Sequence, residues 1–287
     1  MLSPENFMIR IVSWNIQYGK GNDGQVRLDR IIEVLQEGAA DVICLQEISR
    51  HDPALEGADQ LQQLQAAFPE HQVFWGPSWE RPGATPDRPC SFGNAILTSL
   101  PWTQVLRHQL PQPADAQAYS MPRQAVELFL QGTPGLRILT THLEFFSARQ
   151  QLAQAVALNL RQQEARLQAR NPSPSKPGTP FSGLDVPERA VICGDFNFEP
   201  RSAAYGRLTD PDDAGDPVWQ DAWGLCFPER KHDPTCGVFP DPQWPQGPHC
   251  RDFFFLSGLK ASEVVNLEVD LATDASDHQP IWLELDL

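Results

Sequence analysis

Lysine is scarce in this sequence, and acidic side chains outnumber basic ones. The 287 residues contain 37 Asp and Glu against 22 Lys and Arg, which gives a formal net charge of -15. Tight, sequence-independent binding to long nucleic acid depends on basic side chains that contact phosphates, so this composition argues against it. A nuclease that holds its substrate briefly through a metal ion stays compatible with this charge. The four lysines form no basic run and are Lys20, Lys176, Lys231 and Lys260.

Long apolar runs are also lacking. No stretch of 18 apolar residues predicts a transmembrane helix, and the first ten residues lack the basic start and apolar core of a signal peptide. We therefore expect a cytoplasmic protein without stable membrane insertion, whose six cysteines are reduced. Nothing in the sequence indicates an obligate protein partner. The length and the 41% share of hydrophobic residues are ordinary for a globular protein, and we expect one domain over residues 1–287.

Short runs rich in Ile and Val predict the strands of the fold. Residues 8–13 and 41–45 are two such runs, and between them residues 28–35 place apolar side chains at helical spacing, with Gly38 as a plausible helix end. Several further runs are separated by only short turns, which favours antiparallel pairing. These further strands are predicted at residues 73–75, 94–98, 125–130, 136–141, 190–193, 253–256, 264–269 and 281–285.

One long helix is predicted over residues 147–170, which contain neither Gly nor Pro and are rich in Ala, Leu, Gln and Arg. Its apolar residues are expected on the buried side of the helix. They are Leu152, Val156, Leu160 and Leu167.

Three proline-rich segments, residues 77–90, 171–187 and 233–248, are predicted to be loops. The remaining pattern is two strand-rich halves, each with helices on the outside. It predicts an α/β fold, namely a four-layer α/β/β/α sandwich in which two mixed, mostly antiparallel sheets pack face to face.

Polar side chains follow the apolar runs at several predicted strand ends. Asn15 and Glu47 are two of them, and Asp277 precedes the last strand. Magnesium typically takes one or two protein carboxylates and keeps waters for a substrate phosphate. Glu47 is therefore a candidate metal ligand, Asn15 could orient it or touch the metal through its carbonyl, and Asp277 is a possible second contact. Each residue taken alone is also compatible with a purely structural role.

Two further clusters suit acid–base chemistry. Asp195 and Asn197 project on the same side of a strand, so that one can hold or deprotonate a water while the other stabilises a developing oxyanion. His278 is a possible general acid or base and needs a third group to fix its tautomer. Asp252 is the best candidate, because it begins a strand that could lie beside the last one. The alternative is that Asp252 simply pairs with Arg251.

Three more residues are candidates for substrate contact. His142 ends a predicted strand and Asn94 opens another, so either could donate to a phosphate oxygen. Arg123 could meet phosphate or bridge two loops. A structural role stays open for all three. We expect most tryptophans to anchor the core or loops and one or two to line a cleft and stack on a substrate.

Taken together, these motifs resemble those of the endonuclease/exonuclease/phosphatase superfamily, in the same order and over nearly the whole chain. They are Ser13-Trp14-Asn15-Ile16, Leu45-Gln46-Glu47, Gly93-Asn94-Ala95-Ile96-Leu97, Thr141-His142-Leu143, Gly194-Asp195-Phe196-Asn197, Arg251-Asp252-Phe253-Phe254 and Ser276-Asp277-His278. The resemblance implies a four-layered α/β sandwich with a divalent metal ion at one edge, Mg²⁺ or Mn²⁺.

The resemblance also implies roles for individual residues. Glu47 looks like the main metal ligand, helped by Asn15, with Asp277 near the metal. Asp195 and Asn197 look like the water-activating and oxyanion-stabilising pair. His278 looks like the catalytic imidazole, paired with Asp252. His142 looks like a phosphate contact. Members of the superfamily differ on whether the aspartate or the histidine takes the proton, and the sequence leaves this open.

The sequence thus predicts a magnesium- or manganese-dependent phosphoesterase. Its substrate is expected to be a phosphodiester in nucleic acid or in a nucleotide derivative, since the acidic surface suits a small or briefly bound substrate. A phospholipid or inositol-phosphate headgroup is the alternative substrate. A non-catalytic binding module, with proline-rich loops that dock a protein, is the alternative class.

Overall fold

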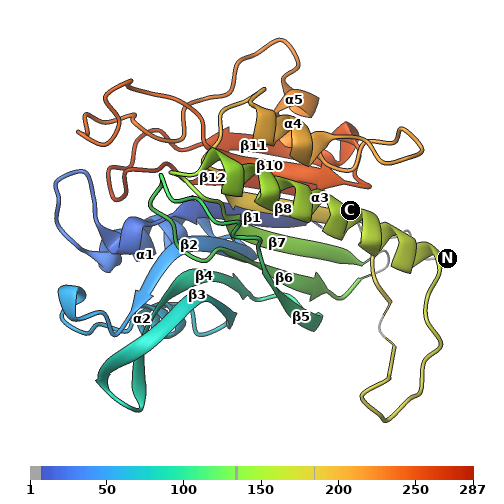
Figure 1. Ribbon diagram of the computed structural model, residues 1–287, viewed down its shortest axis with the longest axis horizontal. Coiled ribbons are helices and arrows are strands. Elements are labelled where there is room, and N and C mark those ends of the chain that lie inside the picture. Colours follow the sequence, from blue (N-terminus) through green and yellow to red (C-terminus); the bar gives the residue numbers. More distant parts are fainter. Residues whose placement is uncertain (1–7, 133–134, 184) are drawn as a thin grey trace.

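The computed structural model describes residues 8–132, 135–183 and 185–287. Residues 1–7 of the amino-terminal segment and residue 184 of the 171–187 loop lie outside the described residues. Figure 1 shows two stacked sheets whose outer faces carry helices, as in the predicted sandwich.

The first sheet has six strands in the order β11-β12-β1-β2-β4-β3. Only β1 and β2 pair in parallel, and they are connected through helix α1 (Leu28–Gly38); the other neighbours are antiparallel. The strands are β1 (Met8–Asn15), β2 (Val42–Arg50), β3 (Gln72–Thr85), β4 (Arg88–Thr98), β11 (Val264–Val269) and β12 (Ile281–Asp286).

The second sheet also has six strands, in the order β5-β6-β7-β8-β10-β9. Here β7 and β8 are the parallel pair, connected through helix α3 (Ala148–Arg170). The prediction of two mixed, mostly antiparallel sheets is therefore confirmed. The strands are β5 (Trp102–Gln109), β6 (Gln124–Leu130), β7 (Leu136–His142), β8 (Ala190–Asp195), β9 (Gln220–Asp221) and β10 (Asp252–Ser257).

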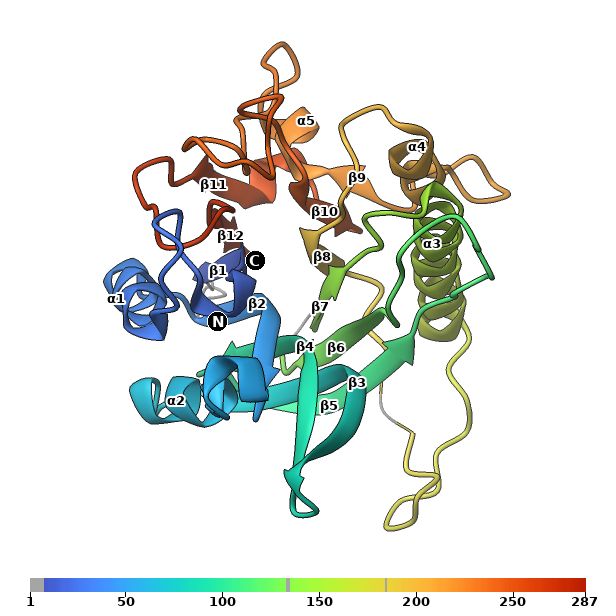
Figure 2. The same ribbon diagram turned by 60° about the vertical axis from the view of Figure 1, so that its left-hand side comes forward.

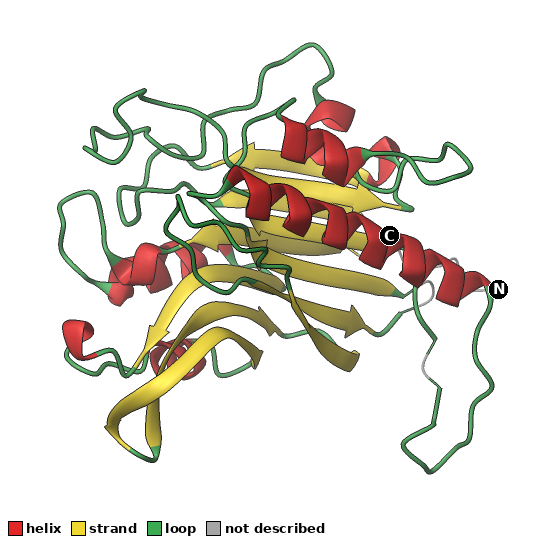
Figure 3. Ribbon diagram, in the orientation of Figure 1, coloured by secondary structure: helices red, strands yellow, loops and turns green. Residues whose placement is uncertain are grey.

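Side-chain alternation along the strands builds the four layers. In β1, Ile9 and Ile11 belong to the core between the sheets, whereas Val12 and Trp14 belong to the core under α1. Helices α1 and α2 (Gln60–Ala67) cover the first sheet, and α3 and α4 (Ala203–Thr209) cover the second. Figure 3 shows these helices on the outer faces. The short elements are α5 (Ala222–Cys226), η1 (Gln17–Gly19), η2 (Pro53–Leu55) and η3 (Ala261–Glu263).

The predicted loop over residues 77–90 is wrong. Strands β3 and β4 run through it as a hairpin, with pairs from Gln72 and Thr98 out to Thr85 and Arg88. Figure 2 shows this hairpin projecting beyond the rest of its sheet. Its prolines are tolerated because β3 is an edge strand, where a missing N–H breaks no ladder on the free side. Consequently Asn94 lies inside β4 and does not open a strand.

The extent predicted for the long helix is confirmed, but its predicted buried side is wrong. Leu160 and Leu167 are 56% and 61% exposed, and the buried side carries many polar residues. Gln162 donates to the backbone oxygen of Glu188 and to the hydroxyl of Ser257 at the end of β10, because these buried polar groups need partners. None of the helices in the described part of the chain has the length and apolarity needed to cross a membrane.

A buried carboxylate holds β6 to its neighbours. Glu127 is fully buried and faces three basic side chains, those of Arg137, Arg161 and His108. Burial alone would raise the pKa of Glu127, but the His108 hydrogen bond and the two guanidinium groups outweigh it and lower the pKa to about 2. These ion pairs of Glu127 are expected to stabilise the folded state at every pH at which Glu127 is ionised.

We predict that Glu127→Gln lowers the free energy of unfolding at pH 7 by roughly 3 kcal/mol, because a pKa depressed from 4.5 to about 2 corresponds to that difference. The stabilisation is complete above pH 4.5 and is lost as the pH falls toward 2, so the gap between variant and wild type should narrow below pH 4. Urea unfolding at pH 7 and pH 3 measures both values.

The matched control is Glu164→Gln. Glu164 also pairs with Arg161, but its side chain is 61% exposed, so its loss should change stability by less than about 0.5 kcal/mol. Equal stability of Glu127→Gln and wild type at pH 7 would contradict the assignment.

Candidate active site

Three neighbouring strands of the second sheet carry polar residues in register at one end of the sheet, which we call the site edge. The ladder pairs His142 of β7 with Asp195 of β8, and Asp195 with Asp252 of β10. Strand alternation places Asp195 on the same face as Val191 and Cys193, which belong to the core between the sheets. These carboxylates therefore point into the space between the two sheets.

The first sheet brings its own polar residues to the same edge. Asn15 ends β1 and stands in register with Gln46 of β2. Gln46 is fully buried, and its amide donates to the hydroxyl of Thr140 on the opposite sheet at 2.8 Å. A polar layer thus separates the apolar core from the strand-end residues beyond it.

A β-bulge re-aims Glu47. Leu45 pairs with Ala95, but the next pair is Ile48 with Gly93, so Gln46 and Glu47 together oppose one residue of β4. Simple alternation would put Glu47 on the outer face with Leu45. Its positive φ of 60° instead turns the side chain to within hydrogen-bond distance of Asn15.

Asn15 links the two carboxylates across the sheets. Its amide nitrogen donates to Glu47 Oε1 and to Asp195 Oδ2, both at 2.9 Å. Its oxygen accepts from the backbone N–H of Gln17 at 3.0 Å. This arrangement favours the orienting role for Asn15, one of the two roles that the sequence left open.

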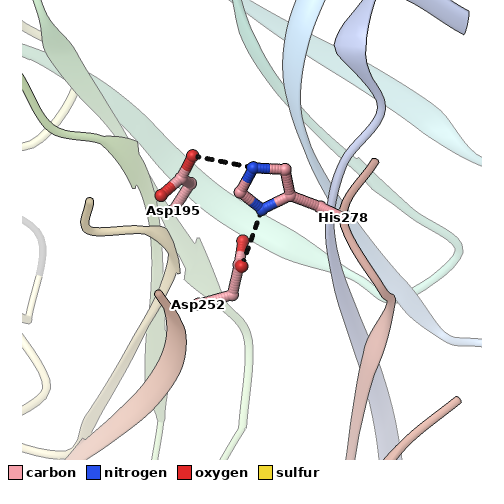
Figure 4. Close-up of side chains that lie close together, drawn as sticks. All are labelled: Asp195, Asp252 and His278. Carbon is pink, nitrogen blue, oxygen red and sulfur yellow. Dashed lines mark hydrogen bonds and ion pairs between the residues drawn. The ribbon is translucent and has the colours of Figure 1, made fainter. Parts of the chain in front are cut away.

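His278 lies between two aspartates, as Figure 4 shows. Its Nδ1 is 2.8 Å from Asp252 Oδ2, and its Nε2 is 3.7 Å from Asp195 Oδ2. The expectation that β10 lies beside the last strand is wrong, because β10 and β12 belong to different sheets. The contact forms because the sheets face each other. The carboxylate of Asp252 bonds to His278, whereas Arg251 donates elsewhere.

Asn197 and His142 form a second contact beside Asp195. The amide nitrogen of Asn197 is 3.0 Å from His142 Nε2, and the Asn197 backbone N–H donates to Asp195 Oδ1 at 2.9 Å. Gly194 makes this turn possible. Its φ is +140°, and a Cβ there would lie 1.9 Å from the backbone oxygen of Thr141.

Burial and close charges perturb the pKa values of this cluster. Burial, reinforced by Asp277 and Asp195, raises the pKa of Glu47 to about 7. Burial and the neighbouring charge of Arg123 together lower the pKa of His142 to about 3, so this imidazole is neutral and Nε2 can accept from Asn197. Burial opposes the charged form of His278, but Asp252, Asp195 and Asp277 outweigh it and raise its pKa well above the usual value.

The donor set fits a divalent cation. Asp277 is buried and Glu47 is partly buried, and the pKa values of both carboxylates are raised, first by burial and then by neighbouring carboxylates, so a cation would relieve both effects. Ligand atoms of Asp195, Asp252 and His278 also lie within 4.8 Å of one another. In that trio, however, the imidazole already bonds to Asp252. Glu47 and Asp277 are therefore the better candidates for hard-cation ligands.

The structure also places Asn94 and Arg123 near this edge. Asn94 is buried in β4 opposite the bulge, and its amide makes only a long contact of 3.4 Å to the backbone oxygen of Gln124. Arg123 is buried against Glu144, yet its Nη1 has no hydrogen-bond partner among the residues that the structure describes. A buried donor without a partner is costly, so Nη1 is suited to donate to an incoming oxyanion.

Three residues at the site were given no specific role from the sequence. Thr235 donates to Asp252 Oδ2 at 2.6 Å, and Trp244 Nε1 donates to Asp277 Oδ2 at 3.1 Å. Both lie in the 233–248 loop, whose length and prolines gave no signal of such contacts. Arg251 Nη1 donates to the backbone oxygen of Asn197 at 2.6 Å. Its position next to Asp252 was the available signal.

Sequence comparison then identifies the family. The model of the Endonuclease/Exonuclease/phosphatase family matches residues 12–278. The chain belongs to this family. Members of the family are hydrolases that act on phosphate esters and depend on divalent metal ions. No curated protein matches the chain in sequence.

Solved structures share the family's fold at low sequence identity. An endonuclease/exonuclease/phosphatase from Bacteroides vulgatus has a TM-score of 0.69 and 18% identity, with 98% of this chain and 99% of that chain covered. A mannosyl-6-phosphatase from Bacteroides thetaiotaomicron has 0.67 and 16%, with 97% and 100% covered. The human nocturnin catalytic domain, solved with bound sulfate, has 0.62 and 18%, with 98% and 96% covered.

We predict that the wild-type protein binds Mn²⁺ and that Glu47→Gln weakens this binding by at least about 10-fold, because the neutral amide removes one of two candidate carboxylate ligands. Isothermal titration calorimetry measures both affinities. Glu33→Gln, which changes an exposed glutamate on the outer helix α1, is the matched control and should bind as wild type does. Absence of binding to the wild type at millimolar Mn²⁺ would instead favour the non-catalytic binding module.

Proposed function

We propose that this protein is a magnesium- or manganese-dependent phosphoesterase that hydrolyses a phosphodiester in nucleic acid or in a nucleotide derivative. One observation carries the proposal. The imidazole of His278 lies between Asp252 and Asp195, and Asn15 connects Asp195 to Glu47 across the two sheets. These groups come from five separate segments of the chain and share one small volume, as expected for a catalytic site.

Asp195 and Asn197 are proposed to handle the attacking water. Burial opposes the charged form of Asp195, but the charge of His278 and the hydrogen bonds from Asn15 and from the backbone of Asn197 outweigh it and lower its pKa. It is therefore ionised and able to accept a hydrogen bond from water and then its proton. The water oxygen forms the new bond to phosphorus as the bond to the leaving oxygen breaks. The Asn197 amide, which donates to the backbone oxygen of Leu143 and to His142, is proposed to exchange the His142 bond for one to the developing oxyanion.

Basic and amide donors are proposed to bind the phosphate oxygens. The protonated His278, oriented by Asp252, can donate to one of them. Arg123 offers the unpartnered Nη1, and Asn94 and His142 stand at the same edge. Glu47 and Asp277 are proposed to hold the divalent cation, whose chemistry is to offset charge on the phosphoryl oxygens.

The net charge of the chain and two solved structures of the same fold support the proposed kind of substrate. A mannosyl-6-phosphatase and a sulfate-bound nocturnin share the fold, which supports an oxyanion-binding edge here. The net charge of -15 with four lysines favours a small or briefly bound substrate over long duplex DNA. The six cysteines are free, which fits the reducing cytoplasm that we propose as its location.

We predict that the wild-type protein hydrolyses bis-p-nitrophenyl phosphate with Mn²⁺ or Mg²⁺ and not after chelation. Glu47→Gln and Asp195→Asn should each lower kcat/KM by about 10²- to 10⁴-fold, the range expected for loss of a catalytic acid–base or charge-stabilising group. Release of p-nitrophenolate measures the rate, and Glu33→Gln should match wild type. Equal turnover by wild type and Glu47→Gln would contradict the proposed function.

A further inference from the structure

Three exposed aromatic side chains gather beside the candidate active site. Tyr119, Phe146 and Phe145 are 82%, 60% and 37% exposed. Their rings are in edge-to-face contact, with centroids 5.6 Å apart for Tyr119 and Phe146 and 4.9 Å apart for Phe145 and Phe146. Phe145 in turn lies 6.0 Å from the buried ring of Trp244. We call these four residues the aromatic ridge.

The ridge is continuous with the catalytic cluster. The ring of Trp244 lies 5.6 Å from that of His278, and its Nε1 donates to Asp277. The guanidinium of Arg251 lies over both Phe145 and Trp244, at 5.5 and 5.4 Å, while it donates to the backbone of Asn197. A path of rings therefore leads from the catalytic imidazole to the exposed Tyr119.

The backbone that carries the ridge is held in place without any substrate. The fully buried carboxylate of Glu144 accepts from the backbone N–H groups of Phe145 and Phe146, each at 3.0 Å. Next to Tyr119, the hydroxyl of Ser120 donates to Gln150 of α3 at 2.7 Å. Exposed apolar rings gain little stability in this position, so a rigid cluster of them beside a catalytic site indicates a binding surface.

We propose that the aromatic ridge binds a nucleobase attached to the phosphodiester that the site hydrolyses, which rests on the function proposed above. Flat rings stack on bases of any sequence, and an arginine beside them adds an attractive cation–π contact. The exposed part of the ridge consists of flat rings in mutual contact with a guanidinium over Phe145, which suits a planar ring better than an acyl chain. The net charge of -15 also disfavours approach to an anionic membrane.

The test compares substrates that differ only in one base. Thymidylyl-thymidine is paired with two analogues in which either the 5′ or the 3′ base is replaced by hydrogen, and kcat/KM is measured with Mn²⁺. Wild type should prefer the base-bearing substrate over one analogue by roughly 5- to 100-fold, the range given by stacking of one base. Phe146→Ala and Tyr119→Ala should reduce this preference. Their kcat/KM on the analogue that lacks the preferred base, called the base-free analogue, should stay unchanged.

Two further variants separate stacking from other causes. Phe146→Leu keeps an apolar side chain but removes the flat ring, so it should behave as Phe146→Ala does. Phe181→Ala removes an aromatic side chain that is 74% exposed in the 171–187 loop, which follows the other end of α3, and should leave the preference intact. If Phe146→Leu kept the wild-type preference, or if the variants affected only vesicle-embedded sphingomyelin, a nucleobase site would be excluded and a lipid contact supported.

Failure of the ridge can be told apart from failure of the catalytic proposal. If wild type cleaves the base-free analogue but shows no preference, the ridge proposal is wrong and the phosphoesterase stands. If wild type cleaves none of these substrates, calorimetry with thymidine 5′-monophosphate and ribose 5-phosphate still tests whether the ridge binds a base. Tighter binding of the nucleotide to wild type than to Phe146→Ala supports the ridge, and equal binding overturns it. A ten-residue oligothymidylate that binds no more tightly than the dinucleotide would assign the site to small nucleotides, and tighter binding would assign it to single strands.

Discussion

Strand alternation between two facing sheets is the constraint on which the candidate site depends. The same faces of β1, β2, β8 and β10 that bury aliphatic and aromatic side chains end in Asn15, Gln46, Asp195 and Asp252. The core therefore changes from apolar to polar along the strands without any change of backbone path. Because register fixes which residues stand side by side, one slipped strand would turn its catalytic side chain to the opposite face.

Backbone strain marks the places where alternation alone does not suffice. Among the residues that the structure describes, eight non-glycine residues have positive φ, and Glu47 and Asn197 are two of them. Glu47 lies at the bulge of β2. Asn197 lies two residues beyond the end of β8, so the prediction that it shares one side of a strand with Asp195 is wrong. Gln17 and Tyr18, just after Asn15, are two more. Such conformations are unfavourable for these residues, so the surrounding hydrogen bonds and packing must over-determine them. The site thus draws on the stability that the layered core supplies.

The sequence predicted the architecture well because periodicity is a local property. The runs around Val42 and Val191 are apolar on both faces of their strands, so these strands could be predicted without knowing the tertiary structure. The buried face of α3 could not be predicted in this way, because Gln154 and Gln162 are buried beside Ala155 and Leu158 and bond to polar groups of neighbouring segments. The Asp252–His278 pair was anticipated for an incorrect reason: the strands were expected side by side, whereas the contact crosses from one sheet to the other. Interactions between layers leave no periodic trace in the sequence.

Loops as well as strand ends build the candidate site. Asn15, Asp195 and Asp252 stand at strand ends, whereas Asn197 and His278 lie in the loops beside them. Trp244 and Thr235, which contact Asp277 and Asp252, come from the long 233–248 loop, and Tyr119 comes from the segment between β5 and β6. A loop that both buttresses the catalytic acids and contributes to the surface beside them couples substrate choice to the geometry of the reacting groups. Changes in such a loop are therefore expected to alter turnover together with specificity, and the same is expected of changes on α3, whose Gln151 donates to the backbone oxygen of Asn197.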